Sequence, residues 1–199
     1  MKIFFSPASP FVRKCVVSAA ELGLTLDNLP SAAGPVARDQ TIIAENPLGQ
    51  VPTLLSGEDG ALYDSRVICE YLDAKAGGGR LFPAVGPDRW RALREQALGD
   101  GLLGAALLAR YETVLRPQDK QWEDWTKGQM DKVRTALDGF EAWTEGFGDR
   151  VDIGTITAGC ALGYLDFRFP THPWREDHPK LANWFKTFGA RPSMAGSKP

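Results

Sequence analysis

The sequence has few of the residues that build disulfide frameworks, metal knuckles or acid–base centres. Its 199 residues include three cysteines and two histidines. Cys15, Cys69 and Cys160 are too few and too far apart for a disulfide framework or a metal knuckle, which favours a reducing, cytoplasmic compartment and no bound metal. Only His172 and His178 are available as histidines for acid–base chemistry. Histidine therefore offers little to a catalytic mechanism.

The charge balance and the hydropathy exclude two classes of partner. The chain has 23 Lys and Arg residues against 25 Asp and Glu residues, which gives a formal net charge of -2. It therefore lacks the basic surface that a phosphate backbone requires. No apolar run approaches the roughly 18 residues of a membrane span, and the first residues lack a secretory apolar segment. We expect neither nucleic acid nor a membrane as a partner.

The distribution of tryptophan divides the chain into two parts. Residues 77–83, rich in glycine and proline, do not extend a helix and indicate a linker. We predict one domain at residues 1–76, a linker at residues 77–86 and a second domain at residues 87–199. All six tryptophans lie beyond residue 77: Trp90, Trp122, Trp125, Trp143, Trp174 and Trp184.

The first part alternates strands and helices in the order β-α-β-α-β-β-α. Apolar residues after Pro10 follow a helical period that ends at Gly23. The tetrapeptide at residues 57–60 favours a turn between two strands. Ser65 is predicted to cap the last helix, which ends near Lys75. The predicted strands are residues 2–5, 24–29, 52–55 and 61–63, and the two earlier helices are residues 10–22 and 38–44.

The second part contains only helical patterns. Asp88 is predicted to cap a long helix that Pro117 stops. Asp152 is expected to cap a later helix, with Thr155 returning a hydrogen bond as in a capping box. The fold class is therefore α/β followed by all-α. The predicted helices are residues 88–115, 120–145, 155–167 and 179–190.

Five segments carry motifs in a specific order and spacing. They are residues 6–15, 46–54, 64–68, 158–168 and 178–193. In this order they resemble the glutathione transferase family, over nearly the whole chain. The resemblance implies a thioredoxin-like N-terminal domain, an all-helical C-terminal domain and a homodimer. It also implies a detoxifying enzyme that uses glutathione as cosubstrate, holds no permanent cofactor and conjugates the glutathione thiolate to a small hydrophobic electrophile.

Ser9 is the candidate catalytic residue. It stands at a strand-to-helix turn directly before Pro10, so its hydroxyl is expected at the positive end of the helix dipole. Because a thiol has an unperturbed pKa of about 8.5, a hydroxyl donor and the dipole would favour the thiolate at neutral pH. In the serine-using members of the family, the serine before Pro-Phe has this role. The residues alone also fit a plain helix cap, and Ser6 is a weaker competitor.

Gln50 and Val51 are candidate glutathione-binding residues. A cis bond is expected between Val51 and Pro52, and the turn would leave the Val51 N–H and C=O free for an extended peptide to join as a strand. The resemblance assigns Val51 to the cysteinyl part of glutathione and Gln50 to the neighbourhood of the glycyl carboxylate. The alternative is a trans proline that starts an edge strand.

Asp64 and Ser65 precede the last helix of the first part. The side chain and backbone N–H of Ser65 are expected to receive the γ-glutamyl carboxylate, and Asp64 is expected to pair with the ammonium group. The simpler interpretation is an N-cap, and both interpretations hold together because the cap geometry creates the anion site.

Four further residues have open roles. Cys15 lies on the apolar face of its helix and is expected to be a buried, inert thiol, because no Cys-x-x-Cys motif surrounds it. The resemblance makes Arg110 and Tyr111 candidates for the electrophile pocket. Asp100 is expected on a solvated helix face, with a reach across a dimer interface as the alternative.

Two alternative functions share this fold. A glutathione-binding carrier or regulatory protein needs the same peptide site and has little transferase activity. A glutathione-dependent thiol reductase is disfavoured, because Ser9 stands where the reductase-like classes carry cysteine. Fold alone does not choose among these functions.

Overall fold

The computed structural model describes residues 1–199 and contains two compact units. The first unit comprises Met1–Arg89 and Pro192–Pro199, and the helical unit comprises Trp90–Arg191. The last eight residues thus lie in the first unit, a placement that the sequence did not predict. The domain boundaries at residues 1–76 and 87–199 stay a prediction.

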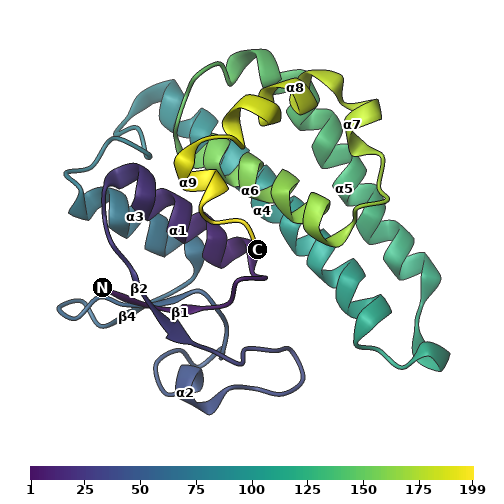
Figure 1. Cartoon of the computed structure of the whole chain (residues 1–199), viewed down its shortest axis with the longest axis horizontal. Helices are drawn as coiled ribbons and strands as arrows, with labels where there is room; N and C mark the ends of the chain where they lie inside the picture. The colour runs from purple at the N-terminus through teal and green to yellow at the C-terminus, as the bar shows by residue number, and fades with distance from the viewer. The chain divides into compact units, whose positions relative to one another are not determined.

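The first unit is built on a four-stranded mixed sheet with the strand order β2-β1-β3-β4. β1 runs parallel to β2 and antiparallel to β3, and β4 is antiparallel to β3. Helices α1 and α3 pack together on one face of the sheet, and α2 lies on the other side (Figure 1). This is the thioredoxin-like arrangement that the sequence predicted. Its elements are β1 (Lys2–Phe5), α1 (Pro10–Leu22), β2 (Asp27–Pro30), α2 (Gln40–Ile43), β3 (Thr53–Leu55), β4 (Ala61–Leu62), α3 (Ser65–Lys75) and α9 (Pro192–Ala195).

Local chemistry fixes the ends of α1 where the sequence predicted them. The Ser9 hydroxyl oxygen accepts the Val12 N–H, and Gly23 ends the helix with φ at 74°. The predicted cap of α3 was wrong by one residue. Asp64 is the N-cap and Ser65 is the first helical residue, because the chain is still extended at Asp64 and its carboxylate accepts the Arg66 N–H at 2.9 Å.

The C-terminal segment is held against α1. The Arg13 side chain is 7% exposed, and its Nη2 donates to the Met194 carbonyl at 3.0 Å. Its Nε donates to the Ser197 hydroxyl at 3.3 Å, and the Ser193 hydroxyl donates to the Glu21 carboxylate. A buried guanidinium needs such acceptors. Side-chain bonds therefore fasten α9 to the first unit.

The helical unit contains the long helices that the sequence predicted. The predicted cap of α4 was wrong, because the helix begins at Gly86 and Asp88 lies in its first turn. The short helices α7 and α9 were not predicted. No helix in the chain combines the length and the apolar character needed to span a membrane. The remaining elements are α4 (Gly86–Val114), η1 (Gln118–Lys120), α5 (Glu123–Trp143), η2 (Thr144–Gly146), α6 (Ile153–Arg168), α7 (Trp174–Asp177) and α8 (Pro179–Phe188).

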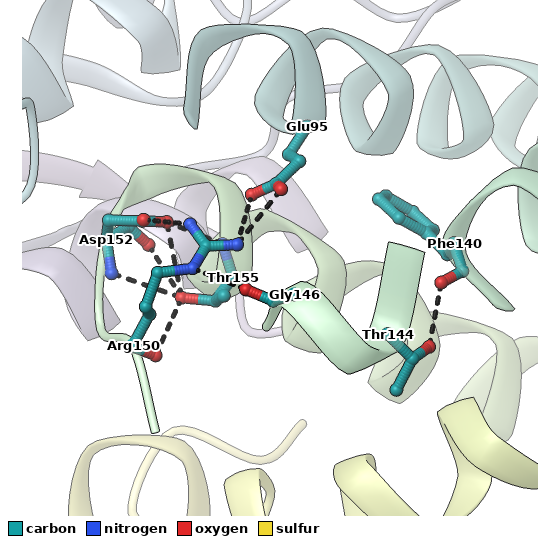
Figure 2. Close-up of polar contacts among 7 residues, drawn as sticks. All are labelled: Glu95, Phe140, Thr144, Gly146, Arg150, Asp152 and Thr155. Carbon is teal, nitrogen blue, oxygen red and sulfur yellow. Dashed lines mark hydrogen bonds and ion pairs between the residues drawn. The ribbon is translucent and has the colours of Figure 1, made fainter. Parts of the chain in front are cut away.

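A buried charge network joins α4 to the start of α6 (Figure 2). Nη2 of Arg150 donates to both carboxylate oxygens of Glu95 at 3.0 Å, and Nη1 donates to Asp152. Asp152 and Thr155 form the predicted capping box, which confirms that expectation. The Glu95 side chain is 2% exposed and that of Asp152 is 8% exposed. Arg150 therefore neutralises two carboxylates that are largely shielded from water.

Two glycines allow α4 and α6 to approach closely. A Cβ atom at Gly154 of α6 would overlap Glu95 and lie 3.0 Å from the Ala92 carbonyl oxygen of α4. A Cβ atom at Gly99 of α4 would lie 2.7 Å from Thr157 Cγ2 of α6. Residues 92–95 of α4 thus contact residue 154 of α6, and residue 99 contacts residue 157. The two helices therefore run parallel where they touch.

Replacement of Arg150 by methionine is expected to lower the free energy of unfolding by about 3–5 kcal/mol, because two buried carboxylates lose their cation. Arg134→Met is the matched control. Arg134 pairs with Asp138 at 3.3 Å on an exposed helix face, so its loss should cost less than about 1 kcal/mol. Denaturant unfolding followed by circular dichroism measures both variants. Equal losses would contradict the importance of the buried network.

The loss in Arg150→Met is also expected to depend on pH. Burial raises the pKa of the Glu95 carboxyl above its ordinary value of 4.5, and the charge of Arg150 opposes that shift. Without Arg150 the folded-state pKa rises further above the unfolded-state pKa. Stability is then retained below the unfolded-state pKa and lost as pH rises through the folded-state pKa. The difference between wild type and variant should be smaller at about pH 4.5 than at about pH 7.

Candidate functional site

The sheet register brings the three sequence motifs of the first unit to one end of the sheet. Phe4 near the end of β1 pairs with Thr53 at the start of β3, and Leu54 pairs with Leu62 at the end of β4. The loop after β1 leads to Ser9, the loop before β3 contains residues 50–52, and β4 leads to residues 64–65. These segments therefore emerge from the same end of the sheet.

Ser9 lies at the N-terminus of α1 and is half-buried. Its Oγ accepts the Val12 N–H at 3.3 Å, so the cap interpretation is correct as far as it goes. A hydroxyl that accepts one bond still has its own proton to donate. The partial positive charge of the helix end and the hydroxyl hydrogen therefore stabilise an anion that approaches Ser9.

Val51 offers free backbone groups beside β3. The Val51–Pro52 peptide bond is cis, which confirms that prediction. No group of the chain forms a hydrogen bond with the Val51 N–H or C=O. Gln50, whose side chain is exposed, precedes it. An extended peptide can therefore form main-chain hydrogen bonds with Val51 as a strand does.

A buried polar network holds the loop before Val51, and sequence reasoning did not single it out. The Asn46 side chain is 1% exposed and its Nδ2 donates to Thr53 Oγ1 at 2.9 Å and to the Gln50 carbonyl at 3.3 Å. Its Oδ1 accepts the Leu48 N–H at 3.0 Å. The Asn46-Pro47 pair is the sequence signal that could have indicated this network, because an asparagine side chain at a turn forms a hydrogen bond with the backbone two residues further on.

The start of α3 supplies a second helix N-terminus at the same end of the sheet. Asp64 is exposed and uses one carboxylate oxygen for the cap, which leaves the other oxygen available. Ser65 is 3% exposed, and neither its N–H nor its hydroxyl forms a hydrogen bond within the chain. These donors suit a carboxylate, and the Asp64 carboxylate suits a cation.

Other residues considered from the sequence lie elsewhere. Cys15 is fully buried, as predicted, with its sulfur 3.9 Å from that of Cys69. Asp100 is only 5% exposed, so its expected place on a solvated helix face was wrong. Arg110 and Tyr111 are half-buried in α4 within the helical unit. No group of three or more His, Cys, Asp or Glu side chains could hold a metal ion.

A thioredoxin-like unit with two capped helix N-termini and free backbone groups at one end of its sheet, followed by a helical unit, is the architecture of glutathione S-transferases. Residues 3–80 match the N-terminal domain of glutathione S-transferases, and residues 123–187 match the C-terminal domain. The chain belongs to the glutathione S-transferase family.

Relatives resemble the chain over its whole length. An uncharacterized GST-like protein of Escherichia coli K12, YibF, is 33% identical, with 100% of this chain and 98% of that protein covered. A glutathione transferase family member from Pseudomonas fluorescens Pf-5 with bound glutathione is 45% identical at a TM-score of 0.97, covering 100% of this chain and 98% of that chain. Its structure with S-(propanoic acid)-glutathione matches at 44% identity, a TM-score of 0.92 and the same coverage.

Asn46→Ala is expected to lower the free energy of unfolding by about 1–3 kcal/mol, because buried groups of the loop lose their hydrogen-bond partners. Gln50→Ala is the control. Only the Gln50 carbonyl takes part in the network, and its exposed side chain should contribute less than about 0.5 kcal/mol. Denaturant unfolding followed by circular dichroism measures both. The network has no structural importance if Asn46→Ala is as stable as Gln50→Ala.

Proposed function

We propose that this chain is a glutathione transferase that conjugates the glutathione thiolate to a small electrophile. The observation that carries the proposal is the Ser9 hydroxyl, which has a proton to donate at the N-terminus of α1. It lies at the same end of the sheet as the free backbone groups of Val51. A peptide held by Val51 would therefore present its side chain near this hydroxyl.

Each part of glutathione has a matching group. The cysteinyl backbone bonds to the Val51 N–H and C=O, and the γ-glutamyl carboxylate accepts from the N–H and hydroxyl of Ser65. Asp64 pairs with the ammonium group, and the exposed Gln50 amide donates to the glycyl carboxylate. These roles are supported by the unpaired donors of Ser65 and by the free carboxylate oxygen of Asp64.

The chemistry requires a thiolate rather than a general base. The thiol of glutathione releases its proton to water, and the Ser9 hydroxyl donates a hydrogen bond to the resulting sulfur anion. The sulfur electron pair then forms a carbon–sulfur bond with the electrophile. If that carbon carries a leaving group, the group departs with the electron pair of its bond. If the carbon belongs to an activated double bond, the π electron pair moves to the neighbouring atom, which takes a proton from water. Binding both reactants supplies proximity.

The wider setting belongs to the same proposal. We infer a homodimer in the cytoplasm that detoxifies electrophiles, with glutathione as cosubstrate and the helical domain selecting the acceptor. The related Pseudomonas fluorescens protein binds a glutathione whose sulfur carries a propanoic acid group. A conjugate with an acidic substituent is thus compatible with this branch of the family.

Ser9→Asp separates capping from catalysis. Aspartate caps a helix as well as serine does, but at neutral pH it has no proton to donate and it repels a thiolate. We expect conjugation turnover to fall by about 10- to 100-fold or more, the worth of one hydrogen bond to a charged group, with unchanged thermal stability. Ser9→Ala should lose the same turnover and also about 1 kcal/mol of stability.

The control for Ser9 is Ser6→Ala, which should leave turnover unchanged. The assay follows conjugation of glutathione to a panel of electrophiles, and calorimetry follows glutathione binding. Wild-type turnover in Ser9→Asp would remove Ser9 from the catalytic role. Glutathione binding without turnover on any electrophile would favour a carrier or regulatory protein.

Asp64→Asn tests the ammonium contact. The amide oxygen still caps α3, so stability should hold, but the negative charge is lost. We expect glutathione to bind about 10-fold or more weakly, as for a lost charge-assisted hydrogen bond. Calorimetric titration with glutathione measures the dissociation constant, with Asp59→Asn, on the exposed turn between β3 and β4, as control. Equal affinities in the two variants would exclude the contact.

A further inference from the structure

Two arginines, Arg110 and Arg168, lie near the C-terminal ends of α4 and α6, beyond the close contact between these helices. From the Gly99–Thr157 contact, each helix continues for eleven residues, from 99 to 110 and from 157 to 168. Because eleven residues make about three turns, Arg110 and Arg168 lie on the same helix faces as the two contacting residues. The positions between them on these faces are all buried: Leu103, Ala106, Ala161 and Tyr164.

The charges of these arginines act on each other and on two phenols. Burial lowers the pKa of Arg168, and the like charge of Arg110 lowers it further. Burial raises the pKa of Tyr164, while the charges of Arg110 and Arg168 oppose that shift. Burial also raises the pKa of Tyr111, while the charge of Arg110 opposes that shift. Arginine stays charged in proteins. Two guanidinium groups and two phenol hydroxyls therefore interact electrostatically in a partly buried region.

Neither arginine has an acidic partner. No carboxylate forms an ion pair with Arg110 or Arg168, and Nε of Arg168 is buried without a hydrogen bond. The acids nearest in sequence are occupied, since Asp166 binds both Nη atoms of Arg175 at 2.6 Å and Glu112 binds Arg116 at 2.8 Å. Arg110 and Arg168 therefore have no carboxylate partner within the chain.

Aromatic rings lie near Arg168 and Tyr164. The Arg168 guanidinium lies 3.8 Å from the centroid of the Phe167 ring, a cation–π contact that uses none of its N–H groups as hydrogen-bond donors. The Tyr164 ring packs against Phe169 with centroids 6.5 Å apart, and Tyr111 is half-buried beside them. Such rings suit the flat apolar body of a ligand whose charged end meets the guanidinium groups.

We propose that Arg110 and Arg168, with the hydroxyls of Tyr111 and Tyr164, form an anion-binding site that takes the carboxylate of an aromatic acid. Guanidinium groups bind carboxylates through paired N–H donors, and the ligand's charge would relieve the repulsion between the two cations. On the proposed function, on which this step rests, the aromatic acid is the acceptor that glutathione attacks. The acceptor would then be an acidic electrophile.

A binding experiment tests the site without any reaction. We would titrate the full chain with 4-methylbenzoate and with neutral 4-methylbenzamide by calorimetry. The benzoate is expected to bind at least about 10-fold more tightly, as for hydrogen bonds to a charged group. Arg110→Gln and Arg168→Gln should each lose this preference, whereas Arg134→Gln, on an exposed helix face, should keep it. Arg168→Lys keeps the charge without the planar fork and should fall between them.

A turnover experiment separates this inference from the proposed function. The reactive pair is 4-(chloromethyl)benzoate and 4-(chloromethyl)benzamide, each corrected for its uncatalysed reaction with glutathione. A carboxylate preference in kcat/KM that Arg168→Gln abolishes supports the site. Benzoate binding without turnover keeps the site and overturns the transferase. Turnover with equal preference for the two compounds, or benzoate binding unchanged in both glutamine variants that remain folded by circular dichroism, overturns the site and keeps the transferase.

Discussion

The Arg150 guanidinium binds two carboxylates that are almost fully buried. Through Glu95 it holds α4, and through Asp152 it holds the first turn of α6 (Figure 2). At the same place Gly154 lets the backbone of α6 lie directly against α4. Because an unpaired buried charge is costly, the two helices have one favourable register. That register decides which side chains meet further along both helices.

Further along, the same register brings two positive charges together. Arg150 has carboxylates to neutralise, whereas Arg110 and Arg168 have none. The negative end of α6 gives Arg168, which lies in the last turn of that helix, some stabilisation. It does not supply in-plane acceptors for the N–H groups. The pair of helices α4 and α6 therefore has ion pairs at Arg150 that contribute to folding. Further along, Arg110 and Arg168 form no ion pair, and these are the residues proposed to bind a ligand.

Elements with ends marked by local chemistry were predictable from the sequence. β1 and α1 have the predicted bounds, because Ser9, Pro10 and Gly23 mark the limits of α1 within a few residues. The cap of α3 was misplaced because Asp64 and Ser65 are both good N-cap residues. The choice between them depends on where the chain leaves its extended conformation, which neighbouring residue types do not reveal. The strand predicted at residues 24–29 is β2 (Asp27–Pro30) in the structure. Its start was misplaced because no strong turn signal stands directly before Asp27.

Contacts between distant parts of the sequence were not predictable. Arg150 and Glu95 are 55 positions apart, and nothing in the sequence pairs Arg110 with Arg168. The candidate glutathione site was easier to predict, because the strand order alone brings its segments together. Val51 contributes its backbone N–H and C=O, which do not depend on the side chain. A site made from strand ends therefore leaves a sequence signal. A site made from side chains on two helices depends on their register, so the proposed acceptor site rests on the part of the fold about which the sequence says least.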